Sequence, residues 1–269
     1  MSIARRLAQA ELRLSRRATP APVTLDPVEL FRRAVGSDPD TWQADVLRSQ
    51  AGRVLMLCSR QSGKSQTTAV IALAEALYNP GSLTLLLAPA WRQSAELFRK
   101  LTDAYNALGQ PVPAKSATAT SLELVNGSRV VSLPGQEGTI RGFSGVDLLV
   151  IDEAARVPDE LYLSVRPMLA VSGGRLVALS TPWGRRGWLY EAWHSSEDWQ
   201  RVRVTALDVP RITAAFLAEE KRNMPRTWYD SEYMCVFSDT VEQVFSSEDI
   251  HAALDPTLEP LFPSHKWEG

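Results

Sequence analysis

A lysine, a serine and two adjacent acids give this chain the residue types that bind and cleave a nucleoside triphosphate. The segment from Ser59 to Ser65 has the sequence SRQSGKS and lies between an apolar run ending at Cys58 and an alanine-rich, helix-forming stretch. In such a turn, successive backbone N–H groups and the helix dipole favour phosphate. We expect Lys64 to neutralise the β- and γ-phosphates and the Ser65 hydroxyl to hold Mg²⁺.

This loop departs from the common G-x-x-x-x-G-K-[ST] pattern, because Cys58 occupies the position of the first glycine. A Gly-Lys-Ser tripeptide is frequent by chance, but the strand before it and the helix after it supply the context that phosphate binding requires. Arg60, within the loop, is a candidate for stabilising charge on the transferred phosphate. The residues predicted to contact the nucleotide in this segment are Ser59, Arg60, Gln61, Ser62, Gly63, Lys64, Ser65 and Gln66.

The paired acids Asp152 and Glu153 follow directly after Leu148–Ile151, an apolar run typical of a buried strand. In open α/β sheets, ligands bind at the carboxyl ends of the strands. Asp152 would coordinate Mg²⁺, and Glu153 would accept a proton from the attacking water. An isolated Asp-Glu pair most often caps a helix, but its position downstream of the Lys64 loop favours hydrolysis.

Three further positions are candidates for work at the same site. Ser180 and Thr181 end a predicted strand and could contact the γ-phosphate or Glu153, and so act in coupling by reporting loss of that phosphate, although they could also simply cap the strand. Arg141 lies in a glycine-rich loop and is either a finger on the γ-phosphate or an exposed loop arginine. The amide of Gln43 could pair with the edge of adenine, or lie on a helix surface.

Strands alternate with helices from Arg53 onwards, which predicts an open, mostly parallel sheet with helices on both faces. Asn126-Gly127 predicts a hairpin with a two-residue type I′ turn. Short helices are expected after Pro27 and after Asp38, the latter residue as N-cap. Strands are predicted at 54–58, 83–88, 121–125, 128–133, 148–151 and 176–180, and longer helices at 65–78, 92–108, 212–223 and 226–237.

Composition limits the function classes. The chain has 269 residues, of which 45% are hydrophobic and 22% charged, and this is ordinary for a globular protein. No apolar run approaches the roughly 20 residues of a transmembrane helix. Two cysteines make no disulfide framework, so a reducing cytoplasm is expected. With a net charge of −2, contact with DNA requires a local basic surface. The candidates, each of which could equally belong to a solvated face, are Arg185, Arg186, Arg201 and Arg203.

In combination, these motifs resemble the ATPase domain of the large terminase subunit of tailed bacteriophages, the motor that pumps DNA into a procapsid. The resemblance covers residues 41–245. It rests on the loop at 60–65 (RQSGKS), the acids at 152–155 (DEAA), the segments at 139–142 (TIRG), 180–184 (STPWG) and 188–191 (WLYE), and the stretch 228–237. No single motif is specific, but the combination is.

The resemblance implies a P-loop NTPase fold of the additional-strand catalytic-glutamate type with a small helical lid. It also implies that Arg141 is a trans-acting finger and that Gln43 contacts adenine. By this reading residues 1–26 form an N-terminal arm and linker, either a solvated helix or a docking arm. Residues 27–210 form the ATPase core, 211–245 the lid, and 246–269 a tail towards a nuclease domain that this chain is too short to contain.

The function implied is ATP hydrolysis that drives double-stranded DNA into a procapsid, without nuclease activity. The implied partners are DNA, the portal protein and the small terminase subunit. The subunits would form a ring on the procapsid and would be monomeric in isolation, located in the host cytoplasm and not retained in the virion. The alternatives are a helicase-like or other nucleic-acid-stimulated ATPase, a phosphotransferase, and a non-catalytic nucleotide-gated module.

Overall fold

The computed structural model describes residues 25–134 and 142–238. Within them, eight strands form one sheet in the order β3-β4-β5-β2-β6-β7-β1-β8. The strands from β5 to β8 in this order pair in parallel, while β3, β4 and β5 pair antiparallel. The strands are β1 (Arg53–Cys58), β2 (Leu83–Ala88), β3 (Ala114–Ala117), β4 (Ser121–Leu124), β5 (Arg129–Pro134), β6 (Leu148–Asp152), β7 (Arg175–Ser180) and β8 (Gln200–Val204).

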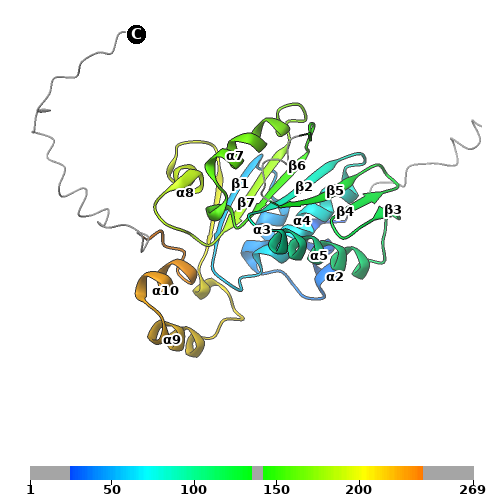
Figure 1. Cartoon of the computed structure of the whole chain (residues 1–269). Helices are drawn as coiled ribbons and strands as arrows, with labels where there is room; N and C mark the ends of the chain where they lie inside the picture. The colour runs from blue at the N-terminus through cyan, green and yellow to red at the C-terminus, as the bar shows by residue number, and fades with distance from the viewer. Residues whose placement is uncertain (1–24, 135–141, 239–269) are drawn as a thin grey trace, which may run out of the picture.

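Helices cover both faces of the sheet (Figure 1), as the sequence predicts. α2 to α5 lie on one face and α7 and α8 on the other. The described helices are α2 (Pro27–Val35), α3 (Thr41–Arg48), α4 (Lys64–Tyr78), α5 (Trp91–Ala107), α7 (Asp159–Val165), α8 (Gly187–His194), α9 (Ala214–Asn223) and α10 (Arg226–Glu232), with short 3₁₀ turns η1 (Ala154–Arg156), η2 (Arg166–Leu169) and η3 (Ala206–Asp208).

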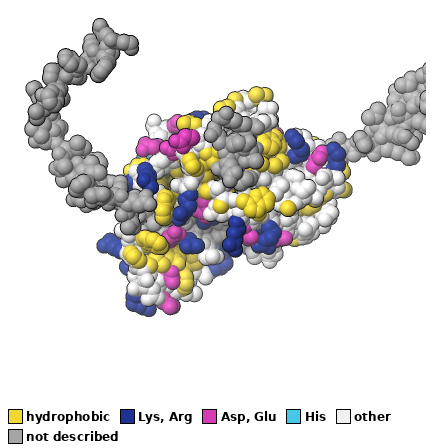
Figure 2. Space-filling model, in the orientation of Figure 1, with side chains coloured by type: hydrophobic (Ala, Val, Ile, Leu, Met, Phe, Trp, Pro, Cys, Tyr) yellow, Lys and Arg dark blue, Asp and Glu magenta, His cyan; other side chains and the backbone are white. Residues whose placement is uncertain are grey.

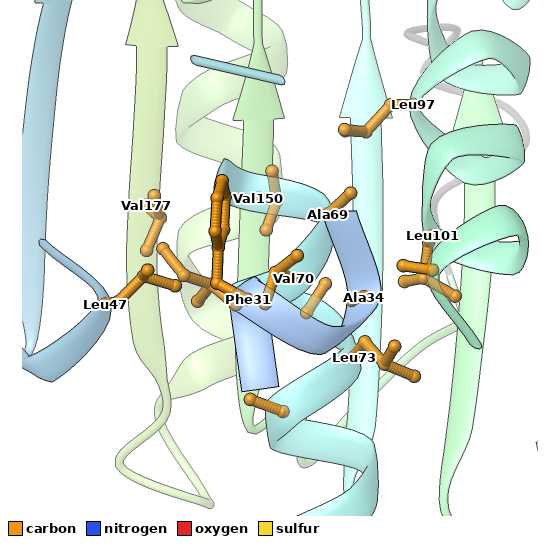
Figure 3. Packing of buried hydrophobic residues seen from close by; sticks show 14 of the residues in the cluster. Phe31, Ala34, Leu47, Ala69, Val70, Leu73, Leu97, Leu101, Val150 and Val177 are labelled. Carbon is orange, nitrogen blue, oxygen red and sulfur yellow. The ribbon is translucent and has the colours of Figure 1, made fainter. Parts of the chain in front are cut away.

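The alternation of side chains along β1 explains why both faces are covered. Val54 and Met56 pack into the cluster beneath α2 to α5, whereas Leu55 and Leu57 pack into the cluster beneath α7 and α8. All four are fully or almost fully buried. Because successive strand residues point to opposite faces, a run of apolar residues is required when both faces are buried. Figure 3 shows the first cluster, in which Phe31 of α2 lies close to the side chains of the sheet.

The chain leaves the sheet after β8 and forms a small helical unit of α9 and α10 (Figure 1). Ala206, Leu217, Tyr229 and Tyr233 make up its own buried cluster. It is tied to the sheet region by main-chain bonds, among them the Arg60 N–H, in the loop after β1, to the Glu232 carbonyl at 3.0 Å. α9 and α10 lie within the range 211–245 expected for the lid, and the role of this unit as a lid stays a prediction.

Two local expectations are wrong. The N-cap of α3 is Asp40 and not Asp38, because Gln43 at the third helical position completes a capping box with Asp40. The hairpin forms, but Asn126 has no positive φ and the turn is not type I′. Its side chain is buried and donates to the Ala76 carbonyl at 2.9 Å, and only Gly127 is left-handed.

Sequence reasoning did not anticipate β3, α7, α8 and β8. The helices predicted at 212–223 and 226–237 are shorter at one end, as α9 begins at Ala214 and α10 ends at Glu232. The N-terminal arm and the tail from 246 lie outside the described residues. Within the described ranges, no helix has the length and apolar character that crossing a membrane requires.

Candidate nucleotide-binding site

The loop at 59–65 connects β1 to α4 and is held from both sides by main-chain bonds. The Ser59 N–H donates to the Val204 carbonyl of β8 at 2.8 Å, and the Arg60 N–H to the Glu232 carbonyl of α10 at 3.0 Å. Gln61 and Gly63 both have positive φ, 59° and 92°. The loop is therefore a tight turn that ends directly at the N-terminus of α4, the arrangement that favours phosphate.

Cys58, which replaces the usual first glycine, is the last residue of β1 and is fully buried. Burial raises the pKa of its thiol to about 12. The side chain is therefore a neutral, packed group beneath the loop, and its replacement of glycine puts no extra charge near the phosphates.

The back of the loop packs against α3. The buried Gln43 accepts a hydrogen bond from the Asp40 N–H and donates to the Thr67 hydroxyl, both at 2.8 Å. A Cβ on Gly63 would lie 2.9 Å from the Gln43 Nε2, so both its φ and this close approach require glycine. Gln43 thus supports the phosphate-binding loop from behind, and its contact with adenine stays a prediction.

The side chains of Lys64, Ser65, Asp152 and Glu153 meet where β1 and β6 end. The Lys64 Nζ lies 3.7 Å from the Glu153 Oε1, and the Ser65 hydroxyl lies 3.5 Å from the Asp152 Oδ2. Glu153 has a left-handed backbone (φ 49°), which costs a non-glycine residue about 1 kcal/mol or more. Asp152 accepts a hydrogen bond from the Glu153 N–H at 2.8 Å. The four residues singled out from sequence are therefore neighbours.

The carboxyl of Asp152 is only 6% exposed, and burial raises its pKa to about 6. The nearby Glu153 carboxylate contributes to this rise in the pKa, whereas Lys64 opposes it. A buried acid without a full set of donors is costly to ionise, and a bound cation removes that cost. The environment of Asp152 therefore suits a carboxyl group that ionises when a metal ion binds to it.

A cavity of about 460 Å³ opens in front of Lys64, Ser65 and Glu153. The loop residues from Arg60 to Ser65 form one wall, and Thr181 of the segment after β7 lies on another. Six charged side chains line the cavity, of which four are basic (Arg60, Lys64, Lys100 and Arg156) and two acidic (Glu153 and Glu232). The excess of positive charge fits a polyphosphate.

The donors present fit Mg²⁺ that arrives with its phosphates. Ser65 and Asp152 offer two hard oxygen ligands, and Mg²⁺ is usually held by one or two protein oxygens together with substrate phosphates and water. Within the described ranges, no group of three or more His, Cys, Asp or Glu residues could hold a metal by itself. Asp152 and Ser65 would therefore hold the ion jointly with the nucleotide.

The two residues predicted for coupling lie next to the acids. The Ser180 hydroxyl accepts a hydrogen bond from the Ala155 N–H at 3.3 Å, and Thr181 faces the cavity. Through this bond, the segment after Glu153 and the segment after β7 are joined directly. Both residues are buried, and their coupling role stays a prediction.

Of the predicted arginines, Arg60 lines the cavity and lies 3.8 Å from the Glu232 carboxylate, while Arg141 lies outside the described residues. The four candidates for DNA contact differ from one another. Arg201 is directed inward and donates to main-chain carbonyls, including that of Trp193 at 2.8 Å. Arg203 donates to the Met234 carbonyl at 2.7 Å.

Arg185 and Arg186 are exposed, and the Arg185 Nε reaches the Phe237 carbonyl at 3.4 Å. On the face shown in Figure 2, the described basic side chains are interspersed with acidic and hydrophobic ones and gather into no single basic patch. The DNA contacts therefore stay a prediction, and Arg201 is the candidate whose guanidinium is most occupied by its own chain.

Sequence reasoning missed several residues at the cavity, namely Gln93, Lys100, Arg156 and Glu232. It also missed Arg211, which forms a two-bond ion pair with Asp40 (2.8 and 2.7 Å) and donates to the Ser62 carbonyl at 3.1 Å. Arg156 carried a signal, as it lies three residues after Glu153, and Glu232 lies in the stretch 228–237 on which the resemblance rests. The others come from elements distant in sequence and are brought to the cavity by the fold.

Comparisons with known proteins agree on one family. Residues 55–252 match the family described as "Terminase large subunit, T4likevirus-type, N-terminal". The terminase large subunit of Thermus virus P23-45 is 26% identical, over 84% of this chain and 54% of that protein. The chain thus spans about half the length of that curated relative.

Solved structures show the same fold. The large terminase ATPase domain of Thermus phage P74-26 superposes with a TM-score of 0.70 at 23% identity, covering 80% of this chain and all of that one. The large terminase of bacteriophage HK97 gives a TM-score of 0.63 at 16% identity, covering 79% and 55%. From the extent of the family match, the chain belongs to the terminase large subunit family, within its N-terminal region.

Proposed function

We propose that this chain hydrolyses ATP, and that the hydrolysis drives double-stranded DNA into a procapsid. The observation that carries the proposal is the meeting of Lys64, Ser65 and Glu153 at one cavity with an excess of basic side chains, with Asp152 beside Ser65. A glutamate beside the metal-binding aspartate favours transfer of the phosphoryl group to water. The structures of related large terminases with ADP and with ATP-γ-S support nucleotide as the ligand.

In this proposal the loop N–H groups and Lys64 hold the phosphates. Lys64 and Glu153 are partners at 3.7 Å, so a triphosphate that attracts Lys64 leaves the Glu153 carboxylate available to water. Glu153 then orients that water and takes its proton. Ser65 and Asp152 would hold Mg²⁺, which would supply neutralisation of the phosphate charge.

The larger assembly is part of the same proposal. Arg141 of a neighbouring subunit completes the site in a ring on the portal, and the small terminase subunit and DNA are the other partners. Loss of the γ-phosphate is transmitted through Thr181 and Ser180 to the segments that they join. The support is membership of the family and the coupling contact between Ser180 and Ala155.

The central test separates binding from chemistry. Glu153→Gln should bind ATP-γ-S like the unaltered protein and lose at least about a hundredfold in phosphate release, because only the proton acceptor is removed. Lys64→Ala should lose binding as well. Nucleotide binding by calorimetry and phosphate release with and without DNA measure both quantities. Unchanged turnover in Glu153→Gln would falsify the assignment of the base.

The ring is tested by mixing two defective proteins on procapsids. Arg141→Ala keeps an intact nucleotide site, and Lys64→Ala keeps an intact arginine, so mixed rings place a good finger opposite a good site. Phosphate release should then recover in part. If the mixture stays as inactive as its components over a wide range of ratios, the finger is not supplied in trans.

A further inference from the structure

Arg156 is a basic residue of the cavity that the proposed chemistry has not yet used. It closes the 3₁₀ turn η1 directly after the acids, is exposed, and lines the cavity together with Lys64 and Glu153. Its guanidinium carbon lies 4.0 Å from the centre of the Trp183 ring. Within the described ranges, no carboxylate lies within ion-pair distance of Arg156.

The two basic residues of the phosphate-binding loop differ from Arg156, because each has a carboxylate partner. Arg60 has Glu232 at 3.8 Å, and Lys64 has Glu153 at 3.7 Å. A cation over an aromatic face is held more weakly than a guanidinium that makes two hydrogen bonds to a phosphate in a partly closed site. Arg156 is therefore held in the cavity by a contact that a phosphate can replace.

Trp183 connects the movement of the Arg156 guanidinium, from the ring to a phosphate, with the segment after β7. It lies two residues after Thr181, which faces the same cavity, and its ring is 39% exposed. The segment that carries Arg156 is already bonded to the segment after β7 through the Ala155 N–H and Ser180. If the Arg156 guanidinium moves from Trp183 to a phosphate, the Trp183 ring in the segment after β7 loses this contact.

We propose that Arg156 binds the terminal phosphate of the nucleotide held by its own chain, and that Trp183 holds the guanidinium until a triphosphate arrives. This inference rests on the proposed nucleotide binding. It differs from the role proposed for Arg141, because Arg156 acts in cis and contacts the phosphate that distinguishes ATP from ADP. Guanidinium suits this contact because it offers two parallel donors to one phosphate.

Binding of two nucleotides tests the inference. Arg156→Gln should weaken binding of ATP-γ-S by about tenfold or more and binding of ADP by less than about twofold, since hydrogen bonds to charged groups contribute this much and ADP lacks the contacted phosphate. Arg156→Lys should recover part of the loss. Isothermal calorimetry with Mg²⁺ measures both affinities.

Arg166→Gln is the matched control. Arg166 also lies over an aromatic ring, with its guanidinium carbon 5.5 Å from the centre of Tyr162, but it does not line this cavity. This variant should bind both nucleotides like the unaltered protein. Equal losses for ATP-γ-S and ADP in Arg156→Gln, or no loss for either, overturn the inference. If the unaltered protein binds neither nucleotide, the proposed function itself fails.

Mixing distinguishes cis from trans. On procapsids at ATP concentrations well below saturation, Arg156→Gln combined with Lys64→Ala should release phosphate no faster than Arg156→Gln alone, because the only subunits that bind ATP lack their own Arg156. The Arg141→Ala mixture described above is the positive control. Recovery of phosphate release in the Arg156→Gln mixture would show that a neighbour supplies this residue and would overturn the cis assignment.

Discussion

Strand β6 has an aspartate at each end, Asp147 directly before it and Asp152 as its last residue, and the two carboxylates have different roles. Before the strand, the Asp147 carboxylate accepts the Leu83 N–H at 2.8 Å, and its main chain bonds Leu83 and Arg175. At the other end, the Asp152 carboxylate has, among the described residues, only the adjacent Glu153 N–H at 2.8 Å and the Ser65 hydroxyl at 3.5 Å. One acid holds two strands together, and the other keeps its coordination incomplete.

Arginines divide in the same way, into those that bond their own main chain and those that face the cavity. Arg201 donates to several carbonyls between α8 and β8, whereas Arg156 faces the cavity over Trp183. Charged groups that bond their own main chain are parts of the scaffold. Charged groups at the carboxyl end of the sheet without such bonds are available to a ligand.

Removing the two acids should separate activity from stability most clearly. Asp152→Ala should reduce Mg²⁺-dependent ATP turnover by more than about a hundredfold, because several kcal/mol of charge stabilisation depend on the ion it holds. Asp147→Ala should leave turnover nearly intact and lower the free energy of unfolding by about 1–3 kcal/mol, since it orphans the Leu83 N–H. Phosphate release and urea unfolding measure the two effects, and equal turnover in both variants would refute the division.

The pH dependence of stability should report the raised pKa of Asp152. Because the pKa of about 6 exceeds the ordinary value of 3.8, the protonated carboxyl stabilises the fold below about pH 3.8, and this contribution is lost as the pH rises through 6. Without metal and nucleotide, Asp152→Asn should therefore match the unaltered protein near pH 4. Above pH 7 it should be more stable by roughly 2–3 kcal/mol.

Urea unfolding at pH 4 to 8 in EDTA measures this difference. Asp152 is almost fully buried, so solvent screening does not erase the effect. A constant offset between the two proteins over the whole range would contradict the raised pKa. Mg²⁺ with ATP-γ-S should stabilise the unaltered protein selectively above pH 6 by binding only its folded state.

The comparison also applies to Arg201 and Arg185, two of the residues predicted to contact DNA. Arg201→Gln should destabilise the fold by about 2 kcal/mol, since the carbonyls of Ala192, Trp193 and Ser195 lose a charged donor. Arg185→Gln, at an exposed position, should change stability by less than about 0.5 kcal/mol. Thermal unfolding measures both. A stable Arg201→Gln that weakens DNA binding would return Arg201 to the DNA surface.

The sequence was informative where one local pattern carries both structure and chemistry. An apolar run followed by Asp152-Glu153, and a glycine-lysine turn before a helix, predict the strands, their direction and the groups at their ends. The placement of Lys100 and Glu232 at the cavity could not be predicted, because it depends on how α5 and α10 pack, and no local pattern records that.

β8 was missed for a different reason. From Arg201 to Val204 charged and apolar residues alternate, which is the pattern of a strand with one covered face. The same two arginines also form a basic cluster, which favours a DNA-binding surface over a strand when only the charges are considered. In the structure Val204 is buried and Arg203 exposed, as an edge strand requires.

Arg211 falls between the two groups of charged residues and should give the smallest effect. It bonds its own main chain at the Ser62 carbonyl and pairs with Asp40, yet it does so directly behind the phosphate-binding loop. Its side chain is 54% exposed, so the ion pair contributes at most about 1 kcal/mol. Arg211→Gln should therefore raise KM for ATP by up to about fivefold, with kcat nearly unchanged, because the loop becomes less ordered while Glu153 is unaffected. Asp40→Asn should raise KM similarly, and the double variant should be no worse than either, since both remove one interaction. Additive losses in steady-state kinetics would show that Arg211 contacts the nucleotide itself and belongs with the residues that face the ligand.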